Sequence, residues 1–196
     1  MNYSVLRKSH LIEPEELNSK LGSSHLVIID MRGLVKATTD AEGFQSAEYL
    51  GARGDYELGH IPGAQYVDWT RDIADLEDPI PVQVAPEAKL KMLFERLGIR
   101  NDSSVVVYDD HPSMQFSTRL WWVCRYMGLT NVRVLDGGWK LWNKLNLPIS
   151  IDIPVIVPSQ VTLTIDSARF CDWQDMLRWS ENSGICLLDA RDKGQF

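Results

Sequence analysis

The sequence predicts an α/β fold in which a mainly parallel sheet is flanked by helices on both faces. Short apolar runs, typical of strands buried on both sides, alternate with segments of helical periodicity. Such alternation suits a parallel sheet, because each new parallel strand must be reached by a crossover. The chain has 196 residues, of which 44% are apolar and 24% charged, enough for one domain or one and a fraction.

The N-terminal half contains two predicted helices and two predicted strands. Residues 13–24 predict a short amphipathic helix, with a proline suited to its first turn and a glycine suited to its end. Residues 26–32 (LVIIDMR) and 63–69 (GAQYVDW) predict buried strands. Residues 85–99 predict a helix, since its large apolar side chains recur at the i, i+3, i+4, i+7 spacing.

The same alternation continues toward the C-terminus. Residues 104–110 (SVVVYDD) predict a central strand and the loop by which it exits. A helix that is apolar on most faces follows at residues 116–128, and a strand that enters a Gly-Gly turn follows at 131–139. Residues 139–146 predict a short helix that ends this part of the chain.

Residues 148–166 have a different composition. They contain three prolines and alternate apolar with polar side chains, so they do not form a helix. A further sheet strand is possible in principle, but we favour an extended, semi-stiff connector.

The chain then repeats its own opening. Residues 167–196 have the order helix, small turn, apolar strand and D-x-R that is seen near the N-terminus. The repeated segments are IIDMR (28–32) and LLDAR (187–191), in which Asp30 corresponds to Asp189 and Arg32 to Arg191. Because one helix and one strand cannot bury their apolar faces alone, this segment must pack on the first domain, stay disordered or belong to a longer protein. We favour the last, in which the segment begins a second domain.

Charge and cysteine content exclude several classes of function. The net charge of −7 argues against binding to nucleic acid or to an anionic membrane. No apolar run is long enough to span a membrane, and the N-terminus lacks the apolar segment of a secretory signal. The three cysteines show no CxxC spacing, so we expect no disulfide framework, no metal, no cofactor and a reducing, cytoplasmic location.

Two segments resemble the signatures of the rhodanese family. YELGHIPGAQYV (56–67) fills every specified position of the first signature: Tyr56, His60, Ile61, Pro62, Gly63, Ala64 and Val67. VRVLDGGWKLW (132–142) resembles the second signature through Asp136, Gly137, Gly138 and Trp139. It departs from the pattern at Leu135, where an aromatic residue is usual, and at Leu141, where an acid is usual.

The order of the motifs resembles the tandem-domain sulfurtransferases, which use thiosulfate or 3-mercaptopyruvate. The resemblance implies a rhodanese-like first domain over residues 11–147, a linker over 148–166 and the truncated opening of a second domain over 167–196. In that family the first domain is non-catalytic, and the active cysteine lies in the second domain. The missing C-terminal domain would therefore be the main partner of this chain.

The loop after the central strand carries the chemistry in this family. A cysteine at its first position is held as a thiolate by inward N–H groups and a helix N-terminus, and it carries sulfur as a persulfide. Here the loop is Asp109-Asp110-His111-Pro112-Ser113-Met114. Asp109 occupies the cysteine position, and a carboxylate cannot accept a sulfane sulfur. The resemblance thus implies no catalytic residue in this chain, which is expected to be inactive alone.

Several motif residues have two possible roles. His60 and Arg191 are candidates for a place beside the substrate, although for both we favour a structural role. Asp30 and Arg32 are expected to anchor loops by charge-assisted hydrogen bonds. His111 beside two aspartates makes a poor metal site, because no distant ligand joins it. The other motif residues are expected to be structural, namely Tyr56, Pro62, Gly63, Asp136, Gly137, Gly138, Trp139 and Asp189.

The resemblance leaves three functions open. The first is a sulfurtransferase that moves sulfane sulfur from thiosulfate to a thiophilic acceptor such as cyanide, through a second-domain cysteine persulfide. The second is a 3-mercaptopyruvate sulfurtransferase, in which an arginine binds the substrate carboxylate at the position of Gln195. Because an amide cannot form that charged pair, we favour thiosulfate. The third is a degenerate rhodanese module for binding or regulation.

Overall fold

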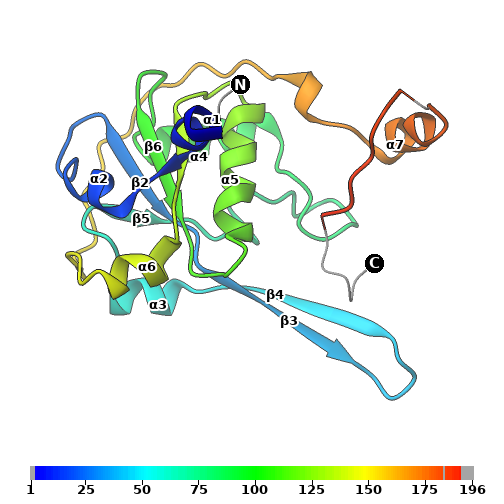
Figure 1. Cartoon of the computed structure of the whole chain (residues 1–196), viewed down its shortest axis with the longest axis horizontal. Helices are drawn as coiled ribbons and strands as arrows, with labels where there is room; N and C mark the ends of the chain where they lie inside the picture. The colour runs from blue at the N-terminus through cyan, green and yellow to red at the C-terminus, as the bar shows by residue number, and fades with distance from the viewer. Residues whose placement is uncertain (1–2, 183, 191–196) are drawn as a thin grey trace.

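A five-stranded parallel sheet forms the centre of the molecule, whose computed structural model describes residues 3–182 and 184–190. The strands are β1 (Leu11–Ile12), β2 (Leu26–Asp30), β5 (Ala64–Tyr66), β6 (Ser104–Tyr108) and β7 (Val132–Leu135). They lie in the order β1-β7-β6-β2-β5, and every neighbouring pair is parallel (Figure 1). The predicted fold class is therefore confirmed.

Helices cover both faces of this sheet. On one face, α4 (Glu87–Arg96) and α5 (Gln115–Tyr126) share a core with Val27 and Ile29 of β2. On the other face, α2 (Pro14–Asn18) and α6 (Gly138–Lys144) share a core with Ile28 of β2. Successive residues of β2 thus point into opposite cores, which explains why its sequence is continuously apolar rather than alternating.

Most predicted elements are present, with shorter bounds. The helix predicted over 13–24 ends at Asn18, and the remainder forms turns up to Gly22, which has a φ of 81°. The connector, residues 148–166, is extended and contains no helix, as predicted. It packs along the domain, and its Val161 is only 4% exposed in the main core.

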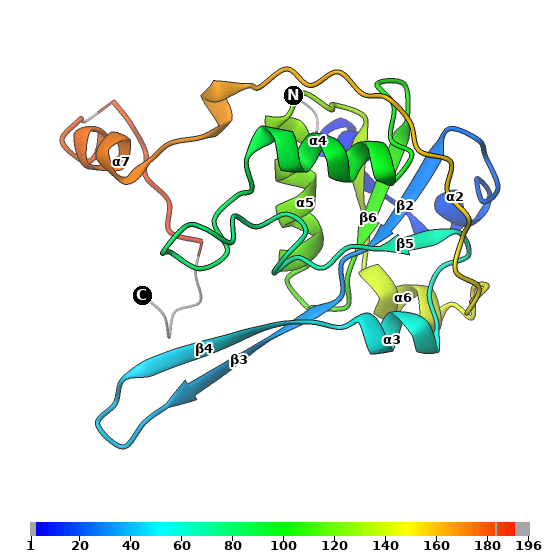
Figure 2. The same ribbon diagram turned by 180° about the vertical axis from the view of Figure 1, so that it is seen from behind.

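Several elements were not predicted, among them the short strand β1. The others are α1 (Tyr3–His10), α3 (Arg53–Leu58) and a hairpin of β3 (Gly33–Thr39) and β4 (Gln45–Gly51). Figures 1 and 2 show that the hairpin extends away from the sheet as a separate arm. Its base is held by Trp69, whose Nε1–H donates to the Leu50 carbonyl at 3.0 Å.

The segment that repeats the opening of the chain is only partly ordered as expected. The predicted helix is present as α7 (Trp173–Ser180), after a short 3₁₀ helix at Ser167–Arg169. The predicted strand at 187–191 is not formed in the part that the structure describes, since residues 185–190 have no regular secondary structure. A parallel strand requires a neighbour, and none of the described strands pairs with this segment.

None of the helices formed by residues 3–182 and 184–190 is long and apolar enough to cross a membrane.

Candidate functional site

The loop of residues 109–114 leaves the carboxyl end of β6 and leads into α5. Asp109 is fully buried at its start. Its carboxylate accepts an N–H bond from His111 at 2.8 Å and another from Ser117, in the first turn of α5, at 2.7 Å. Such N–H groups at a helix N-terminus form an anion site, and here the anion is the side chain of Asp109 itself.

Burial raises the pKa of the Asp109 carboxyl above its ordinary value. The hydrogen bonds from Ser117 and His111 act in the opposite direction because they stabilise the charged form, and the neighbouring Asp110 adds to the increase. The loop therefore surrounds a carboxylate that it only partly stabilises. This group has no sulfur and cannot form a persulfide.

The second signature holds the same loop from the other side. The Trp139 N–H donates to the Asp109 carbonyl at 2.8 Å. At Gly138, where φ is 55°, a Cβ atom would lie 2.3 Å from that carbonyl oxygen, so no larger residue fits without displacement. The close approach of two backbones explains the glycine at this position.

A buried ion pair lies next to the loop, at the end of β2. Arg32 binds the Asp30 carboxylate through Nε at 3.0 Å and Nη2 at 2.7 Å, and the Tyr108 hydroxyl donates to the same carboxylate at 2.7 Å. Arg32 also donates to the Gly59 carbonyl at 2.7 Å and lies 4.5 Å from the centre of the Trp139 ring. These charge-assisted contacts join β2, β6 and both signatures.

Burial also acts on the ionisable groups of this network. It disfavours the charge of Arg32, but the hydrogen bonds and charge of Asp30 outweigh it, and the pKa of the guanidinium is raised. Burial raises the pKa of Tyr108 well above its ordinary value, and the Asp30 charge adds to the effect. Tyr108 therefore remains a neutral hydrogen-bond donor at physiological pH.

A small pocket of about 400 Å³ opens beside the ion pair and the loop. Its lining residues are Arg32, Asp55, Leu58, Gly59, Asp110, Trp139 and Ile149. The positive charge of Arg32 is matched by Asp30, so Asp55 and Asp110 leave the pocket with an excess of negative charge. This environment disfavours the entry of an anion such as thiosulfate.

The first signature places His60 in the interior. The ring is fully buried and stacks on Tyr56 with a centroid distance of 4.0 Å. Nδ1 lies 2.8 Å from the Tyr56 carbonyl oxygen, and Nε2 lies 3.1 Å from the carbonyl oxygen of Asp152. Both nitrogens thus lie within hydrogen-bond distance of backbone carbonyl oxygens. Gly63, with a φ of 79°, completes the turn into β5.

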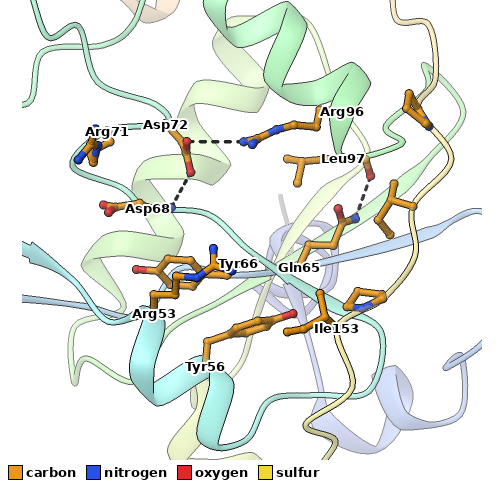
Figure 3. Close-up of a pocket in the computed structure, with 13 residues that line it drawn as sticks. Arg53, Tyr56, Gln65, Tyr66, Asp68, Arg71, Asp72, Arg96, Leu97 and Ile153 are labelled. Atoms are coloured by element: carbon orange, nitrogen blue, oxygen red, sulfur yellow. Dashed lines mark hydrogen bonds and ion pairs between the residues drawn. The ribbon is translucent and has the colours of Figure 1, made fainter.

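A larger hollow lies elsewhere. Figure 3 shows this hollow of about 600 Å³, which is lined by α3, β5, the end of α4 and residues 153–158 of the connector. It is crossed by an ion pair between Arg96 and Asp72 at 3.5 Å. None of its lining residues belongs to the 109–114 loop, so the chemistry of the family would not take place there.

The cysteines do not replace the missing nucleophile. Cys124 is fully buried in α5, and burial raises the pKa of its thiol to about 12. Cys171 and Cys186 are exposed, and neither follows a strand of the described sheet. In the part of the chain that the structure describes, no three His, Cys, Asp or Glu side chains could hold a metal ion. His111 binds Ser113 through Nδ1 at 2.8 Å.

The remaining motif residues fall into two groups. Asp136 of the second signature forms an ion pair with Arg7, and the Asp136 N–H donates to the Ile12 carbonyl at 2.9 Å. Asp189 of the repeat is exposed. Arg191 and Gln195 lie outside the described residues.

A comparison with known protein families matches residues 13–145 to the rhodanese-like domain. The chain belongs to the rhodanese-like family. The match spans α2 through α6 and includes both signatures together with the 109–114 loop. The identification by motif is therefore confirmed.

Relatives of this rhodanese-like chain are sulfur-handling proteins. It is 30% identical to thiosulfate sulfurtransferase of Cricetulus griseus over 74% of the chain and 49% of the relative. It is 36% identical to the sulfur carrier protein TtuD of Thermus thermophilus over 72% of the chain and 50% of the relative. The chain thus spans about half the length of these curated relatives.

A solved structure supports the fold over a longer part of the chain. SseA from Escherichia coli, described among the 3-mercaptopyruvate sulfotransferases, matches with a TM-score of 0.80 and 21% sequence identity. The match covers 95% of this chain and 67% of SseA. At this identity the likeness concerns the rhodanese fold alone.

Proposed function

We propose that this chain is the front part of a tandem-domain sulfurtransferase. Residues 11–147 are its non-catalytic first domain, 148–166 its linker and 167–196 the opening of its second domain. The names of the relatives support sulfur transfer, and the chain matches about half of their length. The repeat of D-x-R near residue 190 supports the assignment of a second domain.

The reaction proposed for the complete enzyme requires a cysteine thiolate in the second domain. The thiolate attacks the outer sulfur of thiosulfate, the sulfur–sulfur bond breaks, and sulfite leaves with the bonding electron pair. A persulfide remains on the enzyme. Cyanide then attacks the outer sulfur of the persulfide, and thiocyanate leaves while the thiolate is restored.

One observation carries the assignment of a non-catalytic first domain. The anion site at the N-terminus of α5 is filled by the buried Asp109 carboxylate, which accepts the N–H groups of His111 and Ser117. A substrate anion would have to displace this side chain and pass the negative pocket beside it. The domain therefore supplies a scaffold rather than a nucleophile.

The surface of α7 supports a further domain as the partner. None of its residues is buried, although Trp173 and Leu177 are apolar and are 71% and 60% exposed. In the first domain, the corresponding helix α2 buries Leu17 against the sheet. We infer that the sheet of a second rhodanese-like domain covers the apolar side of α7 in the same way.

The sulfur donor is proposed to be thiosulfate. Gln195 stands where mercaptopyruvate enzymes of the resembling family have an arginine for the substrate carboxylate, and an amide lacks the charge for this contact. A 3-mercaptopyruvate sulfurtransferase remains the alternative within the same class.

A binding or regulatory module is the second candidate. It is favoured by the 109–114 loop, which holds the buried carboxylate of Asp109 and contains no cysteine nucleophile. Such a module would act through its surface, and the exposed apolar side of α7 would then contact a separate protein.

Thiocyanate formation from thiosulfate and cyanide distinguishes these functions. We expect the 196-residue chain to produce none above the buffer control, because it lacks the nucleophile. The coding sequence beyond the codon of Phe196 is expected to encode a second domain, and the product of that longer sequence is expected to be active. A stop codon at that place would support the binding module. Activity of the 196-residue chain alone would contradict both proposals.

A further inference from the structure

The hollow of Figure 3 has charged side chains on one side and apolar side chains on the other. Three of its lining residues are arginines from separate elements: Arg53 from α3, Arg71 from the turn after β5 and Arg96 from the end of α4. In Figure 3 their guanidinium groups lie on one side of the hollow, and the connector with Ile153 lies on the opposite side. The volume of about 600 Å³ is in the range of pockets that bind small molecules.

Two carboxylates also line the hollow, but both are hydrogen-bonded within the turn after β5. Asp68 accepts the N–H and the hydroxyl of Thr70 at 2.9 and 2.7 Å. Asp72 accepts the Asp68 N–H at 2.9 Å and forms an ion pair with Arg96 at 3.5 Å. The carboxylates are therefore held in place by their own turn, and the three arginines leave the lining with one positive charge in excess.

The three guanidinium groups are available to a ligand. The side chains of Arg53 and Arg96 are 66% and 65% exposed, so their ion pairs with Glu57 and Asp72 contribute little and can rearrange. Within residues 3–182 and 184–190, Arg71 forms no ion pair. Because like charges repel one another, an anion held between these groups would be favoured.

The connector supplies the apolar side of the hollow, through Ile153, Pro154, Ile156 and Pro158. Ile156 is half-buried here, whereas its neighbour Val155 is 96% exposed and does not line the hollow. Tyr66 adds an uncharged ring, because burial and the charge of Asp68 raise the pKa of its hydroxyl. A ligand in the hollow would thus meet an apolar wall opposite three cations.

We propose that this hollow binds a small organic anion, whose acidic group lies between the three arginines and whose apolar body packs against the connector. Guanidinium groups bind the oxygens of such acidic groups through charge-assisted hydrogen bonds. The net charge of −7 disfavours anions over the surface as a whole, so this affinity is local to the hollow. The site goes beyond the proposed sulfur transfer, because no residue of the 109–114 loop lines it.

The apolar wall is held in place on both sides of the hollow. At the start of the connector, Ser150 and His60 exchange backbone hydrogen bonds, both with an N···O distance of 2.9 Å. Further along, the Ser159 N–H donates to the Glu95 carbonyl at 2.9 Å. The hollow is therefore largely preformed, which lowers the cost of binding. A bound ligand would contact the domain and the connector together and stabilise both by mass action.

Naphthalene-2-sulfonate is a suitable probe, because it joins an apolar ring system to a permanent anion. We expect it to shift the amide NMR signals of Tyr66, Arg71 and Ile153 in the whole 196-residue chain, with a dissociation constant of about 1 mM or below. Neutral naphthalene-2-sulfonamide and inorganic sulfate are each expected to bind about tenfold more weakly. Equal binding of the sulfonamide would remove the role of charge, and equal binding of sulfate would remove the role of the apolar wall. Either result overturns the proposal.

Two matched pairs of variants locate the site. Arg71→Gln is expected to weaken binding of the probe about tenfold, whereas Arg178→Gln on α7 removes the same charge elsewhere and should leave it unchanged. Both arginines are exposed, so neither change is expected to affect folding. Ile156→Ser should also weaken binding, through lost apolar contact, whereas Val155→Ser should not. Equal effects of the two arginine variants, or signal shifts confined to the 109–114 loop, refute the site.

Discussion

Asp109 lies in a loop of the rhodanese fold, but its carboxylate cannot carry sulfur as a cysteine can. The side chain is buried where a nucleophile is expected from the resemblance, and it accepts two N–H groups of the loop and the helix that follows. The arrangement needs an anion at this place, and a carboxylate supplies one permanently. The N–H groups that would stabilise a thiolate thus bind the carboxylate of Asp109 here.

The variant Asp109→Cys tests whether the N–H groups of His111 and Ser117 can stabilise a thiolate. We expect the pKa of the new thiol to be lower than the ordinary value of about 8.5, because the His111 and Ser117 N–H groups would now stabilise a thiolate. The rate of alkylation as a function of pH measures this value.

The three native cysteines would contribute a background to this measurement. Cys171 and Cys186 are exposed and would be replaced by serine, while Cys124 can stay, because burial raises its pKa to about 12. A pKa at or above the ordinary value for the thiol at position 109 would show that Asp110 and burial outweigh the N–H groups.

At the scale of single residues, the sequence indicated which residues to examine better than it indicated which partners they contact. The motifs drew attention to Asp109 and to Asp30 and Arg32, and the last two form a buried ion pair. The two carbonyl partners of His60 could not be predicted, because Asp152 comes from the connector. Contacts between segments that lie far apart in the chain leave no local pattern in the sequence.

The Gly-Gly turn before α6 shows how one element constrains another. Gly138 must allow the Asp109 carbonyl to approach, and it has a positive φ of 55°. Gly63, in the turn before β5, has a positive φ of 79° but no atom within 4 Å of a built Cβ. The two glycines therefore differ in contact while they share a backbone conformation.

Replacement of each glycine by alanine separates these effects. Gly63→Ala is expected to cost about 1 kcal/mol in the free energy of unfolding, from the left-handed backbone alone. Gly138→Ala is expected to cost about 2 kcal/mol more, because its methyl group would displace the loop at Asp109. Urea denaturation of both variants measures the difference. Equal losses would mean that the loop yields without cost.

The hairpin of β3 and β4 shows which kind of strand cannot be predicted from the pattern of apolar residues in the sequence. Its strands are polar and mostly exposed, with Lys36 opposite Glu48 and Thr38 opposite Ser46. An alternating apolar face is the usual signal of a strand, and here only the base near Trp69 packs against the core. The central strands were predicted because burial on both faces gave them long apolar runs.

For the whole molecule, the connector and the repeat segment differ in how much they contribute to the first domain. The connector buries Val161 and is hydrogen-bonded to α4 through Ser159. The repeat segment contacts the domain near its start, where Phe170 lies 5.7 Å from Tyr126 between ring centroids. Beyond that, α7 buries none of its side chains.

Two truncations test this division. A chain that ends at residue 171 is expected to keep the full free energy of unfolding, since it retains the connector and Phe170. A chain that ends at residue 147 is expected to lose roughly 3 kcal/mol or more, because Val161 and several hydrogen bonds are removed. Urea denaturation followed by tryptophan fluorescence measures both. An equal loss in the two chains would show that α7 stabilises the domain.

At the scale of the molecule, the sequence predicted the parallel sheet correctly, but it also predicted a strand that residues 187–190 do not form. The apolar run and D-x-R there match those of β2, yet β2 is held between β5 and β6. A strand depends on neighbours that local sequence does not contain. A helix has no such requirement, because its backbone hydrogen bonds are local. The helix α7, which is stabilised by its own capping box at Asp172 and Asp175, was therefore predicted correctly.

The buried carboxylate in the 109–114 loop also has a consequence for mutational history. Aspartate and cysteine codons differ by more than one nucleotide, and the single-step intermediates between them encode glycine or tyrosine. Glycine at position 109 would leave the His111 and Ser117 N–H groups without a partner. Tyrosine would not fit a fully buried position whose own carbonyl is closely approached by Gly138. Each single-nucleotide path from aspartate to cysteine at position 109 thus crosses a less stable protein, which makes that replacement difficult.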